Sequence, residues 1–274
     1  MAESLAFINW TVLTGLSVGS FGAVVLGRLR TEATRGYLGF TGFVAVLLGL
    51  LALASDGGLP GATTAGSPVV VDPAWEPIRR AVLAAFCGLA FGYVIAIARG
   101  RRAPLLAWTA AAAGVAVLAL GALSWGGGPA GAAVLAVELV SLSAALGGCW
   151  AAMILGHWYL VTPKLGEAPL ILFARVLAIV VALQLALFVA WLAVGAGPAG
   201  QPGFAALAGS SALFVWLRLI VGLVFPLVIS WAALQTARTR SMESATGLLY
   251  IDVAAIAAST IVAAGLYFGA GLLV

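Results

Sequence analysis

The sequence predicts an all-α polytopic membrane protein with eight transmembrane helices in a single domain, residues 1–274. Of the 274 residues, 64% are hydrophobic and only 8% are charged, and the mean hydropathy is +1.17. Such values are typical of chains that fold in a bilayer rather than in water. Eight apolar segments each approach or exceed the roughly 20 residues that a helix needs to cross about 30 Å of hydrocarbon.

Two short turns and one longer loop connect the first four predicted spans. No basic stretch precedes the first span and no small-residue cleavage site follows it, so we expect a retained helix and not a signal peptide. The loop 55–78 is rich in Gly, Pro and Thr and is too short for a soluble domain. The predicted spans are 7–28, 36–54, 79–98 and 105–125.

The last four spans are predicted at 132–160, 169–194, 212–234 and 246–272. The seventh contains Pro226, which removes a backbone hydrogen bond, so we expect a kink one turn after Gly222.

Two weaker patterns concern packing. Gly15 with Gly19, and the pair Gly147 and Gly148, would let neighbouring helices approach closely. The segment VLGR at 25–28 is echoed by ILGH at 154–157, each before a basic loop. Repetition of four helices would give halves 1–128 and 129–274 in the same orientation.

Loop charges predict the orientation in the membrane. Basic residues gather in alternate loops, whereas the stretch between Asp56 and Glu76 has no Lys or Arg. The positive-inside rule then places both termini outside a cell inner (plasma) membrane. Arg79 and Arg80 are the exceptions at the outer end, where we expect local pairing with Glu76 or Asp72.

Charged residues within the spans sort by depth into two layers. Glu138 in the fifth span and Arg218 in the seventh both fall in the outer part of the membrane, and we expect them to pair. Opposite charges at one depth offset the cost of about 2.5–3.5 kcal/mol that each would carry alone. The pair either fixes helix order or handles a proton, with Glu138 accepting it.

The inner layer combines polar, aromatic and charged side chains, which are His157, Tyr159, Arg175, Tyr250 and Asp252. A neutral imidazole beside a tyrosine and an arginine can hydrogen-bond a quinone carbonyl, take the proton that the quinol releases on oxidation, and pass it to a carboxylate. We therefore expect a quinone and proton site here. Two alternatives stay open, a structural ion pair of Arg175 with Asp252 and an interfacial anchor at His157.

Metal chemistry is limited by a single histidine, which excludes bis-histidine haem ligation and histidine-rich zinc or di-iron sites from this chain alone. We expect no metal here. A weaker alternative is copper, because Cys149, Met153 and His157 recur every four residues and offer soft ligands. The first and last are about 12 Å apart along the axis, so only a relay could use all three.

The functional prediction is an integral membrane subunit of a respiratory or electron-transfer complex. In architecture alone, eight helices without bound metal resemble the quinol-anchor subunits of polysulfide reductase type, which implies a quinone pocket and a proton path serving partner redox subunits. Such a chain would not be catalytic alone. The alternatives are a proton-coupled secondary transporter and a structural or assembly subunit. The net charge of +4 lies in the loops, where the bilayer explains it, and gives no support for nucleic-acid binding.

Overall fold

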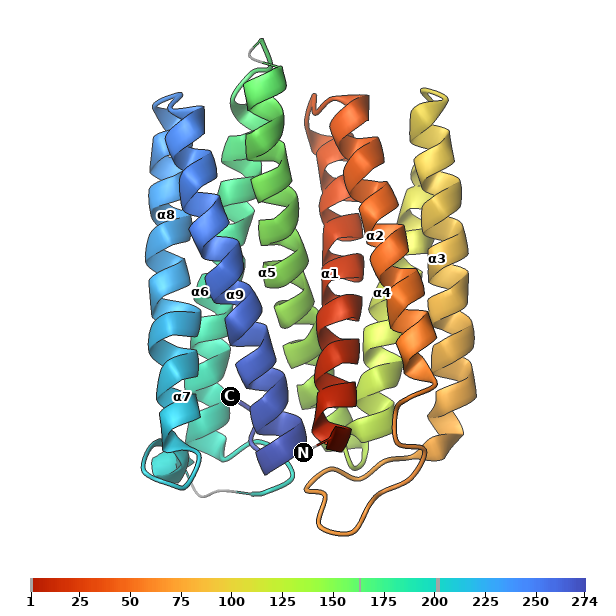
Figure 1. The fold of residues 1–274 in the computed structure, drawn as a ribbon, viewed down its shortest axis with the longest axis vertical. Helices are drawn as coiled ribbons and strands as arrows, with labels where there is room; N and C mark the ends of the chain where they lie inside the picture. The colour runs from red at the N-terminus through yellow and green to blue at the C-terminus, as the bar shows by residue number, and fades with distance from the viewer. Residues whose placement is uncertain (1, 163, 201–202) are drawn as a thin grey trace.

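The protein is a bundle of eight long helical spans (Figure 1). The computed structural model describes residues 2–162, 164–200 and 203–274. The first half comprises α1 (Ala2–Arg30), α2 (Arg35–Asp56), the 3-10 turn η1 (Pro73–Trp75), α3 (Glu76–Ala98) and α4 (Pro104–Trp125). The second half comprises α5 (Pro129–Val161), α6 (Ala168–Val194), the 3-10 turn η2 (Gly203–Leu207), α7 (Ala212–Leu219), the π-helical turn η3 (Ile220–Val224), α8 (Phe225–Arg238) and α9 (Met242–Ala270).

All eight spans are long and apolar enough to cross a membrane, which confirms the predicted fold class. The seventh span is the composite α7–η3–α8. The predicted end of the eighth span at residue 272 is wrong, because Gly271 takes a left-handed conformation at φ 68° and stops α9 at Ala270.

The two halves have matching neighbour relations. In the first half α1 packs on α2, α2 on α3, α3 on α4 and α4 on α1. In the second half α5 packs on α6, α6 on α8, α8 on α9 and α9 on α5. The halves meet through α1 and α5 (Figure 1). This order is what a repeat of four helices would produce, and the duplication itself stays a prediction.

The α1–α5 contact depends on glycine, as the sequence indicated for Gly19 and Gly147. A Cβ on Gly19 would overlap the Ser143 carbonyl group and lie 3.0 Å from the Gly147 Cα. Such close contact exposes carbonyl groups to the facing helix, and serines bond to them. The Ser143 hydroxyl donates to the Gly15 carbonyl at 3.0 Å, and the Ser20 hydroxyl donates to the Gly147 carbonyl at 3.3 Å.

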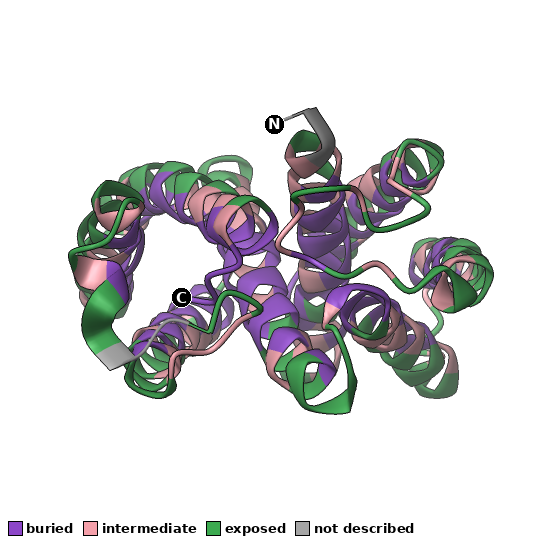
Figure 2. Cartoon of the chain, turned by 90° about the horizontal axis from the view of Figure 1, so that it is seen from below, coloured by how far each residue is buried: buried purple, intermediate pink, exposed green. Residues whose placement is uncertain are grey.

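The bundle has two ends that differ in what they hold. The terminal end holds the start of α1, the loop 57–72 and the end of α9, and the turn end holds the turns 31–34, 99–103 and 239–241. Seen from the terminal end, buried residues line the contacts between helices and exposed residues face outward (Figure 2). Many of the exposed residues are large and apolar, such as Leu105 at 77% exposure, as expected for helices that face lipid.

Candidate functional site

A buried ion pair lies in the second half near the terminal end. Arg218 of α7 is 1% exposed, and its Nη2 lies 3.3 Å from Oε1 of Glu138 on α5. The Trp191 indole of α6 donates to the other carboxylate oxygen at 3.3 Å. Arg218 also donates to the Ser259 hydroxyl of α9, and to the Val274 carbonyl at 3.4 Å. The predicted pairing of Glu138 with Arg218 is confirmed, and four spans converge on it.

A second buried ion pair lies in the first half, where sequence reasoning missed it. Arg79 of α3 binds Asp56 of α2 with both ends of the carboxylate, at 3.2 Å for Nε–Oδ2 and 3.3 Å for Nη2–Oδ1. Arg79 donates to the Ser124 hydroxyl at 3.0 Å, and the Trp10 indole donates to Asp56 at 3.0 Å. The guanidinium carbon lies 4.8 Å from the Trp125 ring centroid.

The expected pairing of Arg79 with Glu76 or Asp72 is therefore wrong. Arg79 is 2% exposed and faces into the bundle, whereas Asp72 caps η1 by accepting from the Ala74 amide at 3.0 Å. One signal was available in the sequence. Asp56 ends the second span and Arg79 begins the third, so the connection between two antiparallel helices returns them to the same depth.

The two ion pairs share a composition. In each half the third helix provides the arginine and the fourth provides a serine that accepts from it. The carboxylate and the tryptophan come from the first two helices of each half, but the helix that carries each of them is swapped between the halves. In the first half Asp56 lies on α2 and Trp10 on α1, whereas in the second half Glu138 lies on α5 and Trp191 on α6.

Ser259 also connects the ion pair of Glu138 with Arg218 to an irregular turn. Pro226 has no N–H to donate to the Gly222 carbonyl four residues earlier, and the Ser259 hydroxyl donates to that carbonyl at 2.8 Å. The backbone here is the π-helical turn η3, closed by the Phe225 amide on the Ile220 carbonyl. The irregularity expected near Pro226 thus takes the form of a π turn, a feature frequent at functional sites.

Residues 271–274 close the ion pair from the terminal end. After the left-handed Gly271 the chain turns back, the Leu272 amide donates to the Leu266 carbonyl at 3.0 Å, and the Leu273 amide donates to the Ala196 carbonyl at 3.2 Å. Leu272, Leu273 and Val274 are all buried. The cavity left beside Glu138 measures about 10 Å³, at the lower limit for a single water molecule.

The inner cluster predicted from depth is not assembled. Asp252 is fully buried and accepts from the Ser230 hydroxyl at 2.6 Å, whereas Arg175, Tyr250 and His157 are exposed. Tyr159 is buried, but its hydroxyl donates to the Gly166 carbonyl at 2.6 Å.

The predicted pairing of Arg175 with Asp252 is therefore wrong. Each outward residue lies two positions from a buried one on its own helix, Tyr250 from Asp252, His157 from Tyr159 and Arg175 from Leu177. Two positions along an α-helix correspond to a rotation of about 200°, so the two side chains of each such pair point to opposite sides of the helix. A quinone role for the cluster stays a prediction without a shared pocket to support it.

Asp252 is the unusual member of this group. Its Oδ1 is buried without a hydrogen-bond partner, and within residues 2–162, 164–200 and 203–274 no cationic side chain lies at ion-pair distance from it. Cys149 of α5 is close by, since its thiol contacts the Leu249 carbonyl, one turn before Asp252, at 3.9 Å. A buried carboxyl with a free oxygen is costly to keep unless it binds something.

The residues of the copper alternative do not converge. Cys149 and Met153 are buried, whereas His157 is exposed. Four residues advance a helix by about 40° beyond one full turn, so the third ligand has rotated out of the contact face. In the described part of the chain, no three His, Cys, Asp or Glu side chains are grouped to hold a metal ion.

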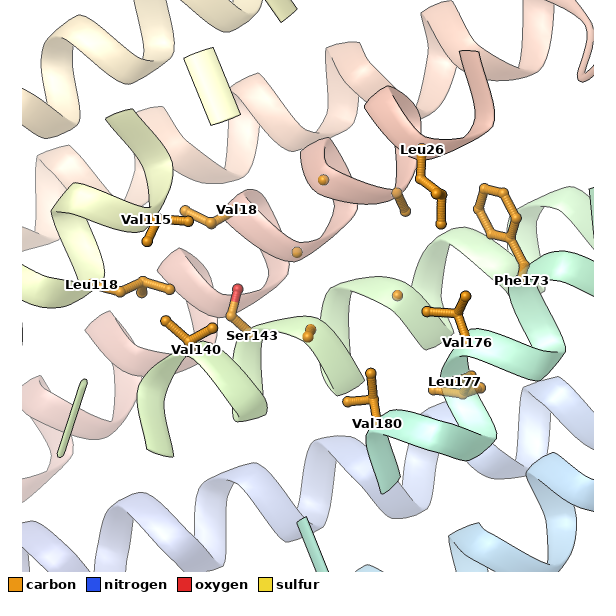
Figure 3. Close-up of a pocket in the computed structure, with 15 residues that line it drawn as sticks. Val18, Leu26, Val115, Leu118, Val140, Ser143, Phe173, Val176, Leu177 and Val180 are labelled. Carbon is orange, nitrogen blue, oxygen red and sulfur yellow. The ribbon is translucent and has the colours of Figure 1, made fainter. Parts of the chain in front are cut away.

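An apolar groove of about 270 Å³ lies on the flank of the bundle between α1, α4, α5 and α6 (Figure 3). Its lining includes Val18, Leu26, Val140 and Phe173. The only hydroxyl in the lining belongs to Ser143, which is already bonded to the Gly15 carbonyl. The groove therefore suits hydrocarbon and offers no free polar group to recognise a head group.

Comparison with protein-family models, with curated proteins and with solved structures gives no match for this chain.

Proposed function

We propose that the protein is an integral membrane subunit whose second half carries protons for an electron-transfer complex in the plasma membrane. The observation that supports this most is Asp252, a fully buried carboxyl with an unpartnered oxygen inside the helix bundle. Ionisable residues within membrane spans are rare, and by default they mark ion and proton pathways. We assign a proton to the free Oδ1, because a fully buried carboxyl with no cationic side chain at ion-pair distance among the described residues can stay neutral by binding one.

A route for the proton follows one face of α9. Asp252 and Ser259 are seven residues apart, which is about two helical turns and roughly 10 Å of rise, so they share a face. Ser259 contacts Arg218, which contacts Glu138. The polar groups therefore form two stations, Asp252 with Ser230 toward the turn end and Glu138 with Arg218 toward the terminal end. The π turn η3 beside Ser259 is where the backbone can open to let water connect them.

The direction of transfer follows from the loop charges. Arginines concentrate at the turn end, so we place that end inside the cell and the terminal end outside. Asp252 would then take protons from the inner side, and Glu138 would release them outside. The subunit gains its electron donors and acceptors from partner redox proteins, and a quinone bound at their contact with this chain remains the expected carrier.

The test uses the tagged chain purified from its native membranes with the subunits that travel with it. The complex is reconstituted into liposomes containing a pH-sensitive dye, and electron transfer is started with a quinol. Asp252→Asn should reduce proton movement at least tenfold while subunit composition stays unchanged. Glu243→Gln is the matched control, because this carboxyl is exposed at the start of the same helix. Proton movement by Asp252→Asn equal to that of the parent complex would refute the proposal.

A proton-coupled transporter is the second candidate, and one observation favours it. The seventh span is interrupted by η3 next to a buried ion pair, and broken helices at charged sites are typical of transporters. In this case the purified chain alone should move protons with a solute across proteoliposomes. Vesicles that stay inert to an imposed pH gradient, with and without candidate solutes, would eliminate it. If Asp252→Asn is also silent in the complex, a structural or assembly subunit is the remaining assignment.

A further inference from the structure

Arginines are distributed unequally over the turn end of the bundle. The first half carries six of them here, called the arginine rim: Arg28, Arg30, Arg35, Arg99, Arg101 and Arg102. A single acidic residue, Glu32, lies among them. The second half has three basic residues and two acidic ones at the same end, and Arg240 is 3.7 Å from Glu167. Both halves face the same membrane surface, so orientation in the bilayer does not account for this difference.

The fold gathers the rim from two adjacent turns. The Arg35 guanidinium passes so close to Gly100 that a Cβ there would lie 2.8 Å from Nη1. The second turn is held in shape by two left-handed residues, Gly100 at φ 74° and Ala103 at φ 38°. Glycine tolerates this conformation and alanine does not readily, so the short turn is under constraint.

The rim arginines are accessible and, in the described part of the chain, are not engaged in ion pairs. Five of the six are exposed, and Arg28 is half-buried with an Nε that is buried and has no hydrogen-bond partner. Within the described residues, the ion pairs involve only Arg79, Arg218 and Arg240, so no rim arginine lies at ion-pair distance from a described acidic side chain.

We propose that the arginine rim binds the phosphodiester head group of an anionic phospholipid. Arginine is the side chain best suited to this task, because its planar fork donates two parallel hydrogen bonds to phosphate oxygens. Basic clusters next to the ends of membrane helices are known to recognise such head groups.

The surface beside the rim decides between a lipid and an acidic protein. Large apolar side chains lie within a few residues of the arginines and are exposed, with Phe40 at 49%, Leu105 at 77% and Trp108 at 60%. Phe40 follows Arg35 by a little more than one turn, and Leu105 and Trp108 lie in the first two turns of α4, which begins at Pro104 after Arg102. A phospholipid satisfies both features at once, since its phosphate meets the arginines and its chains cover the apolar side chains. The polar surface of an acidic protein would satisfy only the first.

The test measures lipid binding by the full chain in detergent. Phosphatidylglycerol, phosphatidylcholine and inorganic phosphate are titrated separately, and bound lipid is counted by native mass spectrometry. The triple variant Arg99→Gln, Arg101→Gln, Arg102→Gln removes three exposed charges without touching the core. Each removed charge should weaken phosphatidylglycerol binding about fivefold, and all three together about a hundredfold. The matched control is Lys164→Gln with Arg238→Gln, which removes basic residues of the second half, and we expect less than a twofold change.

Three outcomes would overturn the proposal. Equal binding of phosphatidylcholine would mean that head-group charge is not recognised. Inorganic phosphate that displaces the lipid at equal concentration would mean that a free anion site is present and not a lipid site. A loss of about fivefold per removed charge in the control variant would mean that total charge, and not the rim, determines binding. If the triple variant fails to fold by circular dichroism, Arg35→Gln alone should give the fivefold loss.

Discussion

Breaking the ion pair between Glu138 and Arg218 should cost several kcal/mol of folding free energy, and restoring neutrality should recover much of it. The carboxylate oxygen and the guanidinium nitrogen are 3.3 Å apart, and the side chains are 6% and 1% exposed. At an effective dielectric constant of about 20, two unit charges at this distance attract by about 5 kcal/mol. Desolvation of both groups opposes that attraction, so the net value of the pair is much smaller.

Each single substitution removes one charge and leaves the other buried without its partner. Glu138→Gln keeps an acceptor for the Trp191 indole but leaves the Arg218 charge without its glutamate partner, so we expect a loss of about 3–5 kcal/mol. Arg218→Met leaves the Glu138 carboxylate similarly uncompensated and should cost about the same. The double variant carries no buried charge at this point, and its loss should be smaller than that of either single variant.

The assay is reversible unfolding in mixed micelles by titration with sodium dodecyl sulfate, followed by far-ultraviolet circular dichroism. Arg240→Gln is the control, because its ion pair with Glu167 is exposed on both sides and should contribute less than about 1 kcal/mol. The reasoning is refuted if both single variants unfold within about 0.5 kcal/mol of the parent protein, or if the two losses simply add in the double variant.

Other buried contacts should also respond to substitution or deletion. Arg79→Met should destabilise the first half by about 3–5 kcal/mol in the same assay, because it leaves a buried carboxylate without its cation. Gly19→Leu should abolish stable folding in detergent, since even a Cβ collides with α5, whereas Gly148→Ala, which has open space, should change stability by no more than about 1 kcal/mol. A reporter cysteine, Ala263→Cys, can be placed beside the ion pair in a chain whose two native cysteines have been replaced. Deletion of residues 272–274 should make this cysteine reactive to a water-soluble maleimide. Unchanged protection would mean that this segment is not what shields the ion pair.

The outcomes for the charged residues show which information the sequence carries. Depth was predictable, because helix rise per residue is constant and the span limits were nearly right. Glu138 and Arg218 were paired correctly on that basis, since both also face inward. Arg175 and Asp252 matched in depth equally well, yet Arg175 points outward and no pair forms. Depth alone therefore cannot identify a site.

Rotation about the helix axis is the missing quantity. In a soluble protein an apolar stripe reveals which face of a helix is buried. The helices here are apolar on all sides, because lipid and core are equally apolar, so composition leaves the buried face undetermined. The pairing of Asp56 with Arg79 was missed for a related reason. Its members come from the ends of two spans, where charge is expected at the membrane surface and not in the core.

The amino-acid sequence by itself determined that this protein crosses a membrane eight times, roughly where each crossing starts and stops, and the depth of the charges inside the spans, because these depend on apolar length and helix rise. Tertiary structure alone decided which helices are neighbours and which way each side chain points. Those choices depend on close packing between particular surfaces, such as Gly19 of α1 against Gly147 of α5, and they paired two arginines with carboxylates while leaving one oxygen of Asp252 free.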